Sequence, residues 1–261
     1  MTVSDSVGNS MMRIPVVDLH RQTERLRPAL LASINRVLDR SWYVLGPEVR
    51  AFEDEFADYC GRRYCVGVGN GFNALSITLR ALDIGPGDEV ITVANAGGFS
   101  TLAIVNSGAK PHFVDIEPST YNIDPTAAKA ALNARTRAIL VTHLYGRLAD
   151  VATLGRLAHD NGLPIIEDCA QACGAQWKLR SVGSWGDIGC FSFFPTKNLG
   201  AAGDGGAVTT KDPYLSQRMR ELSVHGMPRR YVHSQLGYNS RLDALQAAIL
   251  NVKLPKLSGW V

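Results

Sequence analysis

The sequence predicts an α/β fold with a mostly parallel, seven-stranded sheet that helices cover on both faces. Two observations support this prediction: seven short β-rich runs follow one another along the chain, and longer amphipathic runs separate most of them. Alternation of this kind is typical of parallel sheets whose two faces are both buried under helices. The expected strands cover residues 64–68, 89–93, 112–116, 138–144, 163–168, 189–194 and 206–210.

Helical patterns fill the intervals between the strands and both ends of the chain. Pro47 is well placed at the start of a helix, and Gly162 is well placed at the end of one. We expect one large domain over residues 13–240, preceded by a disordered leader at 1–12. The expected helices cover residues 22–40, 47–60, 73–82, 101–108, 125–133, 149–162, 212–222 and 241–253.

The composition is that of an ordinary globular protein. The 261 residues include 27 basic and 24 acidic side chains, a net charge of +3, which gives no reason to expect nucleic acid or an anionic membrane as partner. No apolar run reaches membrane-spanning length and the start lacks the segments of a signal peptide, so we expect a cytoplasmic protein. Four of the five cysteines lie in or beside apolar runs, and none has zinc-ligand spacing. We therefore expect reduced, buried thiols and no metal site.

A single lysine stands at the carboxyl end of a β-rich segment within residues 190–208. Lys197 follows Phe191, Phe193 and Phe194 and precedes a glycine-rich stretch. A lysine attacks a carbonyl carbon only as the neutral amine, so it needs a desolvated pocket or a nearby cation to lower its pKa. The aromatic side chains are candidates for such a pocket. Taken alone, however, the segment is better explained as an exposed lysine in a turn.

Two other segments place chemical groups at strand ends. The apolar run 163–166 ends in Glu167 and Asp168, and a carboxylate there can hydrogen-bond a protonated ring nitrogen such as that of pyridoxal phosphate (PLP). Three glycines, the last of them Gly71, lead from a strand directly into a helix, whose free N–H groups bind phosphate well. Their spacing does not fit the dinucleotide-binding pattern. Each segment alone has an ordinary explanation, but together the three predict a phosphate cradle, a ring-nitrogen carboxylate and a reactive lysine.

Several motifs resemble the DegT/StrS family of sugar aminotransferases, in the family's order and spacing from about residue 14 onward. They are GNGFNAL, GPGDEVITVAN, VDIEPSTYNID, THLYG, IEDCAQACGA, SFFPTKNLGAAGDGGAV and GYNSRLDALQAAIL. The resemblance implies a PLP enzyme of fold type I that acts on keto-sugars carried by a nucleotide. By the same resemblance, Lys197 forms the Schiff base with the cofactor and Asp168 is the pyridinium partner. Gln171 contacts the cofactor ring or its phenolic oxygen, and Ser192 binds the phosphate.

The resemblance also implies a shared active site in a homodimer. The backbone at Gly71, Phe72 and Asn73 corresponds to the phosphate cradle. Asn239 corresponds to an asparagine that reaches across the dimer interface to the phosphate of the neighbouring subunit, and Arg241 is expected to order that loop. Relatives that act as sugar dehydratases carry histidine in place of the reactive lysine, so the lysine favours transamination.

Two positions depart from the family's pattern. Phe72 replaces the usual threonine, which removes a hydroxyl contact to the phosphate, and Gly97 occupies the position of the aromatic residue that stacks on the cofactor ring. We expect Phe72 or Phe99 to supply the ring face instead. These changes predict a pocket of different shape.

Family members continue into a small C-terminal domain, whereas this sequence ends at Val261. We therefore expect residues 241–261 to begin a helix leading to a domain that is absent, and the apolar stripe at Leu242, Leu245 and Ile249 to lack its partner.

Three functions remain open at this point. The first is an aminotransferase that makes an amino sugar on a nucleotide carrier, with glutamate as amino donor. The second is an inactive fragment that acts only in cofactor binding or dimerisation. The third is an aminotransferase of a cyclitol ketone. Outside the three segments, His143 is explained better as a satisfied core residue than as a site residue.

Overall fold

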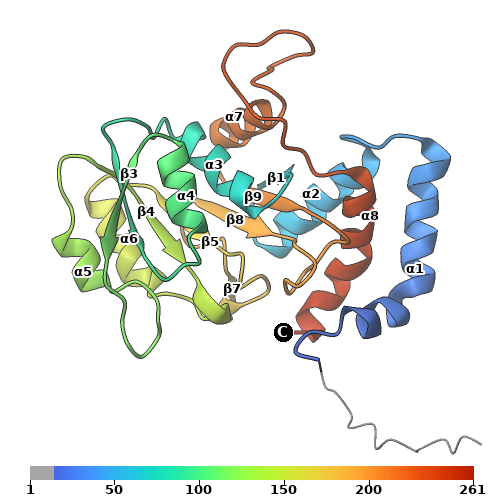
Figure 1. Ribbon diagram of the computed structural model, residues 1–261, viewed down its shortest axis with the longest axis horizontal. Helices are drawn as coiled ribbons and strands as arrows, with labels where there is room; N and C mark the ends of the chain where they lie inside the picture. The colour runs from blue at the N-terminus through green and yellow to red at the C-terminus, as the bar shows by residue number, and fades with distance from the viewer. Residues whose placement is uncertain (1–14) are drawn as a thin grey trace, which may run out of the picture.

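The computed structural model describes residues 15–261, so the leader expected at 1–12 lies outside the described residues. A seven-stranded sheet of order β1-β9-β8-β5-β4-β2-β3 forms the centre of the protein (Figure 1). β9 runs antiparallel to its neighbours β1 and β8, and all other pairs are parallel, which confirms the predicted sheet. The strands are β1 (Tyr64–Val68), β2 (Glu89–Val93), β3 (Lys110–Val114), β4 (Thr136–Thr142), β5 (Ile165–Asp168), β8 (Ile188–Ser192) and β9 (Gly206–Thr210), with a separate hairpin of β6 (Gln176–Trp177) and β7 (Arg180–Ser181).

Helices cover both faces of the sheet, as expected. In β4, Ala138 and Leu140 join the core under α3, α4 and α7, whereas Ile139 and Val141 join the core on the opposite face. This alternation follows from the two-residue period of a strand. The helices are α1 (Leu19–Arg40), α2 (Pro47–Tyr59), α3 (Gly71–Ala81), α4 (Phe99–Asn106), α5 (Pro125–Ala130), α6 (Val151–Asp160), α7 (Pro213–Ser223) and α8 (Ala244–Lys253), with the 3-10 helices η1 (Leu144–Gly146) and η2 (Leu254–Gly259).

The strand β3 begins two residues earlier than the sequence predicts, at Lys110 instead of His112. Pro111 obscured this start, because proline is rare inside strands. Here β3 pairs only with β2 and forms an edge of the sheet, where a residue without an N–H group is tolerated.

The apolar stripe of α8 is covered, so the expectation that it lacks a partner is wrong. The N-terminal helices α1 and α2 both pack against α8. Leu242 is fully buried and Ile249 is only 6% exposed. The hydroxyl of Ser33 in α1 also donates a hydrogen bond of 3.0 Å to the carbonyl oxygen of Ala248. The partner comes from a segment some two hundred residues earlier, which local periodicity does not reveal.

The cysteines are as predicted: all five are free and buried. Burial raises the pKa of the Cys173 thiol to about 12, so it stays protonated and unreactive at neutral pH. Within residues 15–261, no helix combines the length and the apolar character that a bilayer crossing requires.

Candidate active site

The strands β1 and β8 end side by side at one edge of the sheet. Val68 and Ser192, their last residues, both lie opposite Gly206 of the intervening strand β9. The helix α3 starts three residues after β1, so its first residue, Gly71, lies against the end of β8. A Cβ atom on Gly71 would be only 2.7 Å from the Cβ of Ser192. Only glycine fits at this position, and the close approach places the N-terminus of α3 beside the Ser192 hydroxyl.

The first turn of α3 offers free main-chain donors. Asn70 caps the helix, and its Oδ1 accepts a hydrogen bond of 2.9 Å from the amide of Asn73. The side chain of Asn73 donates in turn to the hydroxyl of Ser240 at 2.9 Å. The amides of Gly71 and Phe72 have no partner within the helix, because the first amides of any helix lack one. Of the three residues expected to form the phosphate cradle, Asn73 has its amide already hydrogen-bonded, so the amides of Gly71 and Phe72 are the two without a partner in the helix.

Asp168 ends β5 at the same edge and is 5% exposed. Its Oδ1 accepts a hydrogen bond from the amide of Ala170 at 3.1 Å, and its Oδ2 accepts one from the hydroxyl of Ser100 at 3.3 Å. Burial raises the pKa of this carboxyl, while these hydrogen bonds and the nearby charge of Lys197 oppose the rise. Ser100, at the start of α4, was not found from the sequence because no motif marks it.

Lys197 lies in a tight loop after β8. Its amide donates to the carbonyl oxygen of Phe194 at 2.8 Å, and the amide of Ala201 donates to that of Phe193 at 2.8 Å, which closes the loop. A Cβ atom on Gly200 would overlap the carbonyl oxygen of Pro195, so the loop can close this tightly only with glycine there. The loop presents a half-buried Lys197 at the edge where β5 and β8 end.

The prediction that three phenylalanines form a pocket around Lys197 is wrong for two of them. Phe191 and Phe193 are buried on the α2 face of the sheet, with ring centroids 4.9 and 5.3 Å from that of Phe56. Alternate residues at the end of β8 point to opposite faces, and these two point away from the site. Phe194 is half-exposed and does lie beside Lys197.

These groups surround one cavity of about 440 Å³, a size suited to a small organic ligand. Phe99 lies at its wall with 59% of its surface exposed. A Cβ atom on Gly97, which has φ of +68°, would be 3.5 Å from the Phe99 ring, so this ring fills the space beside Gly97. The cavity is lined by Asn70, Gly71, Phe72, Leu75, Phe99, Asp168, Ala170, Ser192, Phe194, Thr196, Lys197 and Asp204.

Four residues expected at the site lie outside this lining: Asn73, whose contacts are given above, and Gln171, Asn239 and Arg241. Gln171 accepts a hydrogen bond of 2.9 Å at Oε1 from the amide of Tyr145. Asn239 is exposed and pairs through its backbone with Val224, and Arg241 is half-buried beyond it.

His143 is a core residue, as the sequence favoured. It is fully buried; its Nδ1 accepts from the amide of Ala149 at 3.2 Å and its Nε2 lies 2.9 Å from Oε2 of Glu167. Glu167 also accepts hydrogen bonds from the amides of Gly183 and Gly186 and lies 3.9 Å from Arg62. This network occupies the face of β5 opposite to Asp168.

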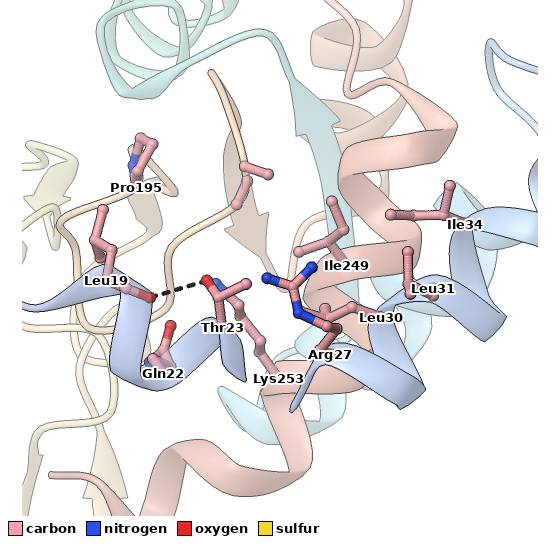
Figure 2. A pocket seen from close by; sticks show the side chains of 12 residues that line it. Leu19, Gln22, Thr23, Arg27, Leu30, Leu31, Ile34, Pro195, Ile249 and Lys253 are labelled. Atoms are coloured by element: carbon pink, nitrogen blue, oxygen red, sulfur yellow. Dashed lines mark hydrogen bonds between the residues drawn. The ribbon is translucent and has the colours of Figure 1, made fainter. Parts of the chain in front are cut away.

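A second cavity of similar volume lies between α1, α8 and the outer side of the Lys197 loop (Figure 2). Apolar side chains such as Leu30, Leu31 and Ile249 form most of its wall. Among the described residues, its lining holds Lys253 but no carboxylate, whereas a lysine, a buried carboxylate and a serine line the first cavity. The first cavity is therefore the better candidate for an active site.

The groups around the first cavity fit PLP. Asp168 is a buried carboxylate with no cation hydrogen-bonded to it in the described part of the chain, and Lys197 lines the same space. The gap over Gly71, which a side chain would close, brings free amides and the Ser192 hydroxyl together, as a phosphate requires. The fold and this combination of groups define a PLP-dependent enzyme.

Comparison with known proteins also indicates a PLP-dependent enzyme. The chain belongs to the DegT/DnrJ/EryC1/StrS aminotransferase family, whose pattern it matches over residues 25–261. It is 46% identical over 249 residues to a "pleiotropic regulatory protein" of Geobacillus stearothermophilus, and 47% identical over 247 residues to the UDP-N-acetyl-3-dehydro-alpha-D-glucosamine 3-aminotransferase of Acidithiobacillus ferrooxidans. Each alignment covers 95% of this chain and 67% of the relative.

Among solved structures, DesV of S. venezuelae, solved with a ketimine intermediate, superposes with a TM-score of 0.94 at 46% identity. That alignment covers 95% of this chain and 67% of the DesV chain, so the chain spans about two thirds of the length of the proteins it resembles. Membership of this family makes the protein a PLP-dependent aminotransferase.

Proposed function

We propose that this aminotransferase converts a keto-sugar carried by a nucleotide into the amino sugar, with glutamate as amino donor. The observation that carries the proposal is that one cavity joins Lys197 to the buried carboxylate of Asp168 and to the start of α3. The substrate class is supported by the A. ferrooxidans relative, which is named for a UDP-linked keto-sugar.

PLP supplies an aldehyde that takes up amino groups and a ring that withdraws electrons. Asp168 would hold the protonated ring nitrogen, and Ser192 with the amides of Gly71 and Phe72 would bind the phosphate. Lys197 would hold the cofactor through Nζ in the resting enzyme. The amine of Lys197 is also the group in this cavity that would take up and release a proton at Nζ during transamination.

We also propose a cytoplasmic homodimer. Asn239 is exposed and does not line the cavity of its own chain, which supports the expected role of this residue toward a neighbouring subunit.

The test is the visible absorbance of PLP bound to the purified chain, followed by addition of glutamate. We expect glutamate to bleach the absorbance, a UDP-linked 3-keto-sugar to restore it, and a cyclitol ketone to leave it bleached. Lys197→Ala should lose the absorbance, while Lys211→Ala, a change of an exposed lysine after β9, should keep it. Restoration by the cyclitol ketone alone would favour the cyclitol enzyme. Binding of PLP without any response to glutamate would favour the inactive fragment.

A further inference from the structure

The loop that carries Lys197 is held from outside by the helix α8. Lys253, at the end of α8, donates a hydrogen bond of 2.7 Å from Nζ to the carbonyl oxygen of Gly200. Gln246, two turns earlier, accepts one of 2.9 Å at Oε1 from the amide of Ala202. Both bonds reach main-chain atoms within five residues of Lys197.

The contact at Gln246 is close as well as polar. A Cβ atom on Gly203 would lie 3.0 Å from Nε2 of Gln246, so the amide group packs directly on the loop backbone. Main-chain hydrogen bonds within the loop, as between Ala201 and Phe193, also shape it, and the hydroxyl of Ser192 accepts one from the amide of Phe194 at its start. α8 therefore supplies side-chain support where the loop turns back toward β9.

The buried ammonium group of Lys253 lowers the stability of the fold. It is 6% exposed, and within residues 15–261 it forms no ion pair with a carboxylate. It reaches from α8 into the groove of Figure 2, where most of the neighbouring side chains are apolar. Burial lowers the pKa of its ammonium group, as expected when a charge leaves water without a counter-charge. A methionine would fill the same volume without this cost, so the residue is poorly explained by stability alone.

We propose that Lys253 and Gln246 are positioning residues. They fix the loop after Lys197, so that the side-chain amine of Lys197 faces Asp168 and Ser192. This inference rests on the proposed role of Lys197. It also makes α8 the element through which a shift of the packing between α1 and α8 would reach the active-site lysine.

The test compares Lys253→Met and Gln246→Met with the wild-type chain, with Lys256→Met as an exposed control on η2. Amide hydrogen exchange is measured for peptides covering 194–203 and, as reference, the buried strand β1. PLP affinity and the fraction of PLP that borohydride fixes on Lys197 are measured on the same samples. We expect exchange over 198–203 to accelerate and PLP affinity to fall, each by roughly fivefold, as for the loss of one hydrogen bond. Exchange in β1 and the melting temperature of the PLP-free chain should stay unchanged.

Gln246→Glu keeps an acceptor oxygen and should restore wild-type exchange and PLP affinity. Unchanged loop exchange and affinity in both methionine variants would overturn the proposal. Faster exchange throughout the chain with a lower melting temperature would also overturn it, because that pattern marks a purely stabilising role. If the wild-type chain does not fix PLP on Lys197, the proposed function fails, and the exchange data alone decide whether α8 holds the loop.

Discussion

Gly71 and Ser192 approach so closely that a methyl group on the glycine would lie 2.7 Å from the serine Cβ. We predict that Gly71→Ala pushes the start of α3 away from the end of β8 and separates the two free amides from the Ser192 hydroxyl. The expected result is at least a tenfold loss of PLP affinity, about 1.4 kcal/mol, measured by titration of the visible absorbance.

A matched control is available in α6. A Cβ atom on Gly155 would meet no neighbouring atom, so Gly155→Ala should leave PLP affinity unchanged and stabilise the helix by about 0.5–1 kcal/mol. If Gly71→Ala bound PLP as tightly as Gly155→Ala, the cradle at α3 would be wrongly placed.

The strand ends were the most predictable part of this site. Asp168 and Lys197 each follow an apolar run, and the carboxyl ends of parallel strands meet at one edge of a sheet, so their proximity follows from local patterns. The side chains around Lys197 could not be predicted in this way, because the direction of Phe191 and Phe193 depends on the pleat of β8 and on packing against α2. Tertiary contacts bring Ser100, Gln246 and Lys253 to the site, and such contacts leave no pattern in the local sequence.

Phe99 and Phe72 both line the cavity, but they differ in their packing. Phe72 packs on the core beneath α3, whereas the Phe99 ring is 59% exposed and fills the space beside Gly97. We predict that Phe99→Ala weakens PLP binding by roughly 1 kcal/mol, the size of one aromatic contact. Phe72→Ala should mainly lower the melting temperature, because it removes a partly buried side chain. PLP titration and thermal unfolding of both variants check this assignment, which an unaltered affinity in Phe99→Ala would contradict.

The buried carboxyl of Asp168 makes stability and PLP binding oppose one another. Burial raises the pKa of this carboxyl in the folded chain above its value in the unfolded chain. The free energy of unfolding therefore falls as the pH rises from the unfolded pKa through the folded pKa, and above that range the full loss is present. Asp168→Asn removes it, and we predict an equal or higher melting temperature of the PLP-free variant at pH 7 together with at least a tenfold loss of PLP affinity. A variant that melted well below the wild type would show that the ionised carboxylate stabilises the fold.

Glu167 differs from its neighbour Asp168 in having a set of buried partners. Burial alone would raise its pKa, but the hydrogen bond from His143 and those from the amides of Gly183 and Gly186 outweigh it, and the pKa is lowered. A carboxyl with a lowered folded pKa contributes stability that is present above its unfolded pKa, near 4.5, and is lost as the pH falls through the folded value. We predict that the urea midpoint of the wild-type chain falls on acidification below this range.

Glu167→Gln should reduce that acid dependence and lower stability at pH 7, because Arg62 then keeps a buried charge without its counter-charge. Loss of one partner of a buried pair costs about 3–5 kcal/mol, which sets the expected size of the change in unfolding free energy. Glu55→Gln, on the exposed side of α2, is the control and should change the midpoint little at either pH. If Glu167→Gln and Glu55→Gln showed the same acid dependence, carboxyls other than that of Glu167 would control acid unfolding.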